Sequence, residues 1–206
     1  MNDEIRVSAR LTILIQETDL FFQAGLQYFF EDFFAHNFHC AIRFCIDLTH
    51  DNVSQADVIV LALCQGETLT CFPELQARQK GIILGLVDDE RHFPALPSCY
   101  QDIIFLPRRA SLDRISGVLY LAWSRTQLPG YSWNKKTCFE CQHKFLSPQQ
   151  IRVMVSFHKG LSVTQTASLL KMSDKTVYAH KYLIMQKFNL RSDYELIVLL
   201  RKLMKK

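Results

Sequence analysis

The sequence of 206 residues has little of what marks fibrous, disordered or membrane-spanning proteins. It contains 7 glycines and 6 prolines, too few for a collagen-like or low-complexity chain. No apolar run reaches the roughly 20 residues that a membrane-spanning helix needs, because a charged or amide side chain interrupts each one. The chain begins Met1-Asn2-Asp3-Glu4, with neither a basic start nor an apolar stretch, so we expect no secretory signal peptide and no membrane partner.

The chain also lacks the paired cysteines of a secreted disulfide scaffold. Its 7 cysteines are odd in number and irregularly spaced, which is typical of proteins in a reducing compartment. We therefore expect a cytoplasmic location. Cys138, Cys141 and His143 have a metal-like spacing, but a structural zinc site needs a fourth ligand and no second pair is evident. Incidental cysteines are the favoured interpretation and a thiol or metal switch is the alternative, so we expect no cofactor.

What the sequence has instead is an uneven distribution of charge behind a net charge of +4. Residues 1–147 carry 13 Lys and Arg against 17 Asp and Glu, a net charge of −4. Residues 148–206 carry 11 against 3, a net charge of +8. A basic region joined to an acidic one indicates a polyanion partner for the second region alone. A solvated lysine-rich helical face is the alternative.

Apolar strand-like runs alternate with helical periodicity over residues 1–125. The strands are expected over 10–15, 40–46, 57–63, 81–87 and 102–106, and the helices over 20–35, 69–80 and 111–125. Strands that are apolar almost throughout, separated by helices, predict a parallel sheet covered on both faces. The predicted fold of this region is therefore α/β and flavodoxin-like, a doubly wound, five-stranded parallel sheet.

The pattern changes after residue 125. Residues 126–145, with Pro129-Gly130 and scattered polar side chains, predict a linker. Residues 146–206 read as a purely helical, four-helix domain in which Ser147, Ser162, Ser173 and Ser192 are the expected N-caps. The second and third of these helices, joined by a tight Lys-Met-Ser connection, predict a helix-turn-helix.

The helical region resembles the DNA-binding domain of LuxR/FixJ-type transcription regulators, NarL-like in organisation. The matching residues span 146–203 and are Leu146-Ser147-Pro148, Gly160-Leu161-Ser162, the 167–170 stretch, Lys175-Thr176-Val177-x-x-His180, Ile184-Met185-x-Lys187-Phe188, and Ser192 followed by Glu195-Leu196. The resemblance implies a regulator that binds double-stranded DNA, with RNA polymerase as a further partner. It also implies a homodimer contact on the last helix, at Leu196, Leu199, Leu200 and Leu203. Burial of these leucines inside the monomer is the alternative.

The periodicity of the third helix separates two faces without reference to the family. Val177, Ile184 and Phe188 form an apolar stripe that is expected to face the core. The opposite face carries Lys175, Tyr178, Ala179, Tyr182 and Gln186. A major groove accepts one helix, whose outward side chains reach base edges. We expect base contacts from Tyr178, Ala179 and Tyr182, and phosphate contacts from Lys175, Thr176 and Lys181.

The acidic α/β region before this module resembles the receiver domain of response regulators. That resemblance implies paired acids after the first strand, an aspartate that accepts a phosphoryl group at the end of the third, a hydroxyl after the fourth and a lysine after the fifth. Four of the five required groups are absent. Thr18 follows the one retained acid, Glu17, and Ala62 takes the phosphoacceptor position. The last two strands end in Leu84-Gly85-Leu86 and Phe105-Leu106-Pro107. We therefore predict a pseudo-receiver without a phosphoacceptor.

Together these features predict a sequence-specific DNA-binding transcriptional regulator that is controlled without aspartyl phosphorylation. Its expected organisation is a regulatory domain over 1–125, a linker over 126–145 and a DNA-binding domain over 146–206. One alternative is an auxiliary co-regulator that works as a heterodimer with a related receiver-bearing protein, and another is the thiol- or metal-responsive sensor. An enzyme is not expected, because no nucleophile–base pair or phosphate-binding glycine loop is evident.

Overall fold

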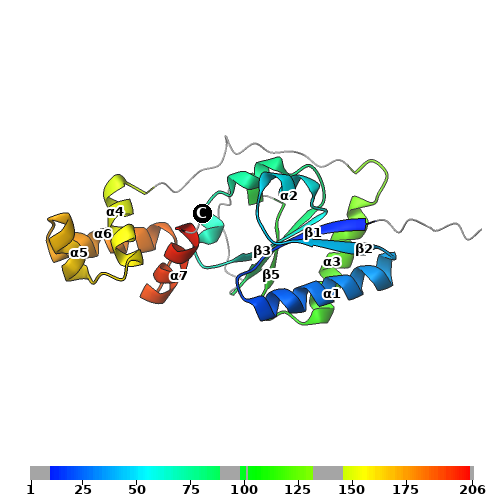
Figure 1. Ribbon diagram of the computed structural model, residues 1–206, viewed down its shortest axis with the longest axis horizontal. Coiled ribbons are helices and arrows are strands. Elements are labelled where there is room, and N and C mark those ends of the chain that lie inside the picture. Colours follow the sequence, from blue (N-terminus) through cyan, green and yellow to red (C-terminus); the bar gives the residue numbers. More distant parts are fainter. Residues whose placement is uncertain (1–9, 89–97, 101, 132–145, 205–206) are drawn as a thin grey trace, which may run out of the picture. The chain divides into compact units, whose positions relative to one another are not determined.

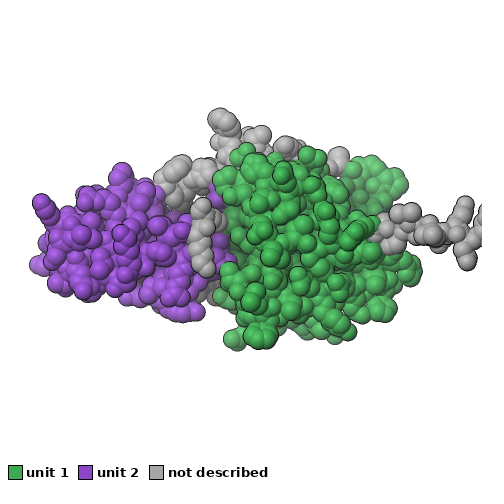
Figure 2. Space-filling model, in the orientation of Figure 1, with its two compact units in different colours: residues 1–63, 72–92, 98–139 green, residues 64–71, 93–97, 140–206 purple. Residues whose placement is uncertain are grey.

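The computed structural model describes residues 10–88, 98–100, 102–131 and 146–204. The chain divides into two compact units (Figure 2). The first comprises residues 1–63, 72–92 and 98–139, and the second comprises residues 64–71, 93–97 and 140–206. Cys138, Cys141 and His143, the weak metal candidates of the sequence, lie outside the described residues.

The first unit is built on a five-stranded sheet of parallel strands, in the order β2-β1-β3-β4-β5 (Figure 1). The strands are β1 (Arg10–Gln16), β2 (Ala41–Cys45), β3 (Val58–Leu63), β4 (Ile82–Val87) and β5 (Ile104–Pro107). Every residue of β3 and β4 is buried, which explains why both read as unbroken apolar runs. This strand order is that of the flavodoxin-like doubly wound sheet, so the predicted fold class is confirmed.

Helices α1 (Leu20–Phe38) and α3 (Leu112–Thr126) cover one face of the sheet, and the short α2 (His50–Gln55) lies on the other (Figure 1). Ser111 caps α3, because its side chain accepts a hydrogen bond from the backbone N–H of Arg114. The rings of Phe34 and Trp123 meet edge to face with centroids 5.3 Å apart, which joins α1 to α3 over the strands. No helix in the described part of the chain has the length and apolar composition needed to cross a bilayer.

Two local features of the α/β part of the chain differ from the predictions. The helix expected over 69–80 is wrong: the segment forms 3₁₀ turns over Glu67–Leu69 and Pro73–Ala77, and a third such turn spans Ser98–Tyr100. Pro73 has no N–H and disfavours a helical conformation at Phe72, which is extended with φ −109° and ψ 97°. Helix α2 was not predicted, since its six residues bury only Val53 and give no periodic signal.

The described part of the second unit contains four α-helices, as predicted: α4 (Pro148–His158), α5 (Val163–Leu170), α6 (Asp174–Lys187) and α7 (Asp193–Leu203). Each of the four expected serines caps its helix by accepting a hydrogen bond from a backbone N–H three residues later, with N···O distances of 3.1–3.2 Å. Gly160 adopts a left-handed conformation, with φ +79°, after the last turn of α4. The starts of these helices could therefore be predicted from the sequence.

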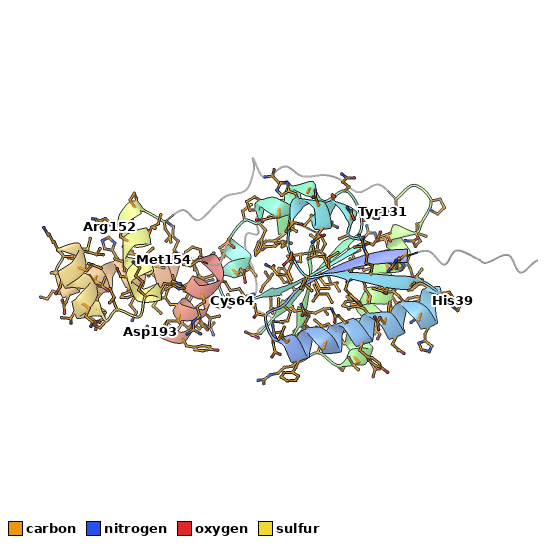
Figure 3. The ribbon with its side chains drawn as sticks, in the orientation of Figure 1. His39, Cys64, Tyr131, Arg152, Met154 and Asp193 are labelled. Atoms are coloured by element: carbon orange, nitrogen blue, oxygen red, sulfur yellow. The ribbon has the colours of Figure 1, made fainter. Side chains whose placement is uncertain are left out.

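One core of the second unit forms where α6 meets α7. Ile184 of α6 and Phe188, the residue that ends this helix, are buried there with apolar side chains of α7, and Cys64 joins the same cluster (Figure 3). Burial and, to a smaller extent, the negative charge of Glu67 together raise the pKa of Cys64 to about 12. The thiol therefore stays protonated at neutral pH, and a protonated thiol is neither a good nucleophile nor a metal ligand.

Candidate nucleic-acid interface

Helices α5 and α6 and the turn between them form a helix-turn-helix. Lys171 ends α5 in a left-handed conformation, with φ +55°, and Ser173 caps α6 two residues later. The hydroxyl of Thr164 on α5 donates to a carboxylate oxygen of Asp174 at 3.0 Å, which ties the first turns of the two helices together. On the inner side, Val177 is buried in a second small apolar cluster with side chains of α4 and α5. These contacts fix the rotation of α6 about its own axis.

The opposite side of α6 faces outward. Tyr178 and Tyr182 are 57% and 61% exposed, although tyrosine rings are usually covered, and Lys175, Thr176 and Ala179 are exposed beside them. Five of the six residues predicted to contact DNA are therefore accessible on the same helix. We call Lys175, Tyr178, Ala179, Tyr182 and Gln186 the outer face of α6.

Lys181 is the sixth predicted residue, and it differs from the others. Its ammonium nitrogen lies 2.5 Å from a carboxylate oxygen of Asp193, the first residue of α7, and its side chain is largely buried. The same nitrogen is 6.0 Å from the centre of the Tyr178 ring. A phosphate at Lys181 must therefore compete with Asp193. No sequence signal indicated this pair, since the two residues are 12 positions apart and on different helices.

The sequence assigned no DNA contact to Gln186, but this residue is hydrogen-bonded to Tyr182, which is predicted to contact a base. Its side-chain nitrogen donates a hydrogen bond of 2.9 Å to the hydroxyl of Tyr182. The spacing of four residues on one helix was the available signal, because such residues are neighbours on a helix surface. The outer face thus contains a preformed polar pair at its C-terminal end.

The leucines of α7 lie in or against the core of their own unit. Leu196, Leu199 and Leu200 are buried in the core of their own unit, and Leu203 is partly buried against the same cluster. The alternative of burial within the monomer therefore describes Leu196, Leu199 and Leu200, and a homodimer contact at the leucines of α7 stays a prediction. Their spacing of three and four residues is itself the signature of a core-facing stripe. The exposed apolar side chains of α7 are Tyr194 and Ile197.

In the first unit, the carboxyl end of the sheet is where a receiver would hold its phosphoryl group. Ala62 is buried on β3 beside Leu86 of β4, so two hydrocarbon side chains occupy this edge. Neither can accept a phosphoryl group. Within the described residues, no group of three or more His, Cys, Asp and Glu side chains is placed to hold a metal ion.

Glu17, the one retained acid, is neutralised by the chain itself. One of its carboxylate oxygens lies 2.7 Å from a guanidinium nitrogen of Arg108, the residue that follows β5. The other oxygen accepts hydrogen bonds from the backbone N–H groups of Thr18 and Asp19, at 2.6 and 2.9 Å. Glu17 is 2% exposed and Arg108 is 25% exposed, so this is a mostly buried ion pair. Sequence reasoning identified the acid but missed its partner.

Arg108 is itself held in place by two neighbours. Its guanidinium carbon lies 4.5 Å from the centre of the Phe22 ring on α1, and its Nε is 3.7 Å from the carboxylate of Asp88, just after β4. A cation stacked on an aromatic ring and flanked by acids is well stabilised. The guanidinium therefore supplies the positive charge that a bound metal ion or a lysine would bring to this edge.

The comparisons with known proteins match a family to the helical part of this chain and solved structures to nearly all of it. Residues 144–200 match the family described as bacterial regulatory proteins, luxR family. No curated protein matches the chain. Among solved structures, RcsB from Salmonella enterica serovar Typhimurium, bound to a promoter in the presence of phosphomimetic BeF₃⁻, is 17% identical, with 91% of this chain and 96% of that chain covered and a TM-score of 0.52.

Two further structures are similar at lower scores. The structure of two RcsB dimers bound to two parallel DNAs is 15% identical, covers 94% of this chain and 98% of that chain, and has a TM-score of 0.48. The response regulator StyR is 17% identical and has a TM-score of 0.40, and the match covers 95% of this chain and 100% of that chain. Residues 144–200, the helical part of this chain, are thus similar to the luxR family of bacterial regulatory proteins, and the chain shares the fold of the RcsB structure.

Proposed function

We propose that this protein is a sequence-specific DNA-binding transcriptional regulator that acts in the cytoplasm. The observation that carries the proposal is the outer face of α6, which is exposed while the inner side of the same helix is locked against α4 and α5. A helix presented in this way fits a major groove. The luxR family match over the same residues supports this function, as does the promoter complex of the similar RcsB structure.

The contacts can be assigned by chemistry. Tyr178, Ala179 and Tyr182 lie in the middle of the outer face and are proposed to reach base edges. Lys175 and Thr176 lie in the first turn of α6, where the positive end of the helix dipole and an exposed ammonium favour a phosphate. Lys181 is proposed as a weaker phosphate contact, because Asp193 already holds it.

We further propose that two subunits bind together, with Tyr194 and Ile197 of α7 as the apolar contacts. A two-fold dimer places its recognition helices about 34 Å apart, so the two half-sites would be inverted and centred one turn of DNA apart. Selection of bound duplexes from a random library by the purified full-length protein tests both statements. Enrichment of an inverted repeat is expected. Enrichment of single half-sites would reject the homodimer, and no enrichment would reject DNA binding by this chain alone.

Changing Lys175 to alanine should weaken binding to all DNA sequences alike. Removing one phosphate contact reduces counterion release, so the slope of log affinity against log salt should become shallower by about 0.9 per subunit. The measurement is a series of mobility-shift titrations at several salt concentrations with a selected duplex and an unrelated one. The matched control is Arg152→Ala, which removes the same charge from the exposed side of α4. Equal slopes for both variants would show that Lys175 touches no phosphate.

We propose that regulation proceeds without aspartyl phosphorylation. The support is the buried Glu17–Arg108 pair, which satisfies the acid that would otherwise bind Mg²⁺, together with Ala62 at the phosphoacceptor position. A second charged group at this edge would have to displace a guanidinium that is stacked on Phe22.

Magnesium ions and beryllofluoride should therefore leave the affinity for a selected DNA site unchanged within about twofold. The measurement compares DNA titrations with and without the two reagents, and incorporation of radioactive phosphate from acetyl phosphate is followed in parallel. The matched control is Ala62→Asp, which restores the phosphoacceptor but leaves Arg108 on Glu17, and it should also remain unresponsive. An increase of tenfold or more in the affinity of the unmodified chain would reject control without phosphorylation.

A further inference from the structure

The outer face of α6 is unusual in its chemistry. Its centre carries two tyrosine rings and a methyl group, and the adjacent Leu183 is also exposed. The helix contains neither arginine nor asparagine. Arginine and lysine are the side chains that pair with the two acceptors of guanine, and asparagine or glutamine pairs with adenine. Of the lysines of α6, Lys181 is bound to Asp193 and Lys187 is partly buried, while Lys175 belongs to the first turn. The centre of the face therefore has no cation for guanine.

Resting on the DNA binding proposed above, we propose that α6 selects A·T-rich major-groove sequences. In this arrangement thymine methyl groups pack against Tyr178, Ala179 and Tyr182, and one adenine edge is read by the Tyr182–Gln186 pair.

The apolar half of this readout follows from the arrangement of three side chains. Tyr182 is four residues from Tyr178 and three from Ala179, so the three are neighbours on the helix surface. The 5-methyl group of thymine is the apolar group that a base pair offers in the major groove. Packing it against exposed ring and methyl surface removes both from water. The position of the Tyr178 ring is further restricted by the ammonium of Lys181, 6.0 Å from its centre.

The polar half follows from the hydrogen bond between Gln186 and Tyr182. Because the Gln186 nitrogen donates to the Tyr182 oxygen, the tyrosine hydrogen and the Gln186 carbonyl oxygen are left side by side as one donor and one acceptor. Adenine presents the complementary set, an acceptor at N7 and a donor at N6. Guanine presents acceptors at both positions, so the Gln186 oxygen would face another oxygen. The pair therefore favours adenine over guanine.

The test uses the full-length protein and a duplex chosen by the library selection. Each thymine of one half-site is replaced in turn by deoxyuridine, which removes the methyl group and keeps base pairing. We expect the affinity to fall about threefold to fivefold at each contacted thymine, by the transfer value of one methyl group. In the Tyr178→Ala and Tyr182→Ala variants, the loss at the corresponding thymine should disappear. Tyr28→Ala, which removes an exposed tyrosine of α1 in the first unit, is the matched control and should keep every loss.

The adenine contact is tested by replacing adenines with 7-deazaadenine, which lacks the N7 acceptor. One position per half-site should lose affinity with the unmodified protein and lose none with Tyr182→Phe, which keeps the ring and removes the hydroxyl. G·C-rich selected half-sites, or deoxyuridine substitutions without effect at every thymine, would overturn the inference and leave DNA binding intact. Failure to select any duplex would overturn DNA binding itself, and the inference with it.

Discussion

Replacing Arg108 with methionine is expected to destabilise the first unit by about 3 kcal/mol. The substitution keeps much of the side-chain volume but leaves the buried carboxylate of Glu17 without its cation. Removing one partner of a buried ion pair typically costs 3–5 kcal/mol, and the lower end applies here because Arg108 is partly exposed. Urea unfolding followed by the fluorescence of Trp123 measures the loss, in a Trp133→Phe background that leaves Trp123 as the single tryptophan.

Two companion variants separate the ion pair from simple packing. Glu17→Gln removes the charge and keeps an acceptor for the backbone N–H groups of Thr18 and Asp19, so it should cost only about 1 kcal/mol. The double variant, Glu17→Gln with Arg108→Met, contains no buried charge and should be more stable than Arg108→Met alone. If the losses of stability in the two single variants simply add up in the double variant, the two side chains do not interact. Arg108 would then not neutralise Glu17.

The second large effect concerns the core under the proposed DNA-binding surface. Ile184→Ala should destabilise the second unit by about 3 kcal/mol, because Ile184 is fully buried between α6 and α7 and its loss leaves a cavity. Hydrogen exchange of the α6 amides measures this effect, and their protection should fall by about a hundredfold.

Leu183→Ala is the matched control, one residue away on the same helix. Leu183 is exposed, so its truncation should change stability by no more than about 0.5 kcal/mol. The contrast depends on the rotation of α6 alone, since the two positions differ by one step of about 100° around the helix axis. Equal losses of protection at both positions would mean that the outer and inner sides of α6 are wrongly assigned.

Much of the architecture could be predicted because its signals are local. The unbroken apolar runs of β3 and β4 record burial on both faces of the sheet, and the four capping serines mark the helices of the second unit. The inner stripe of α6, including Val177 and Ile184, follows from a helical period within one element. Each of these features is contained in a few consecutive residues, where periodicity and turn chemistry act.

The rest depends on residues that are distant in the sequence. Arg108 forms an ion pair with Glu17, which is 91 positions away in the sequence, and Lys181 pairs with Asp193 on a different helix. No period or motif connects such pairs, so the sequence indicated one partner and missed the other. The short α2 and the turn at Pro73 failed for a different reason, because segments of five or six residues give too little pattern to separate a helix from a turn.

The Glu17–Arg108 pair limits the number of states that this site of the first unit can adopt. A site that exchanges a metal ion and a phosphoryl group has two states, and its occupancy reports the activity of another enzyme. A site whose counter-ion is covalently part of the chain has one state, which is set when the protein folds. With the function proposed above, occupancy of an operator would follow the number of molecules in the cell, and synthesis and degradation of the protein would then set the level of regulation.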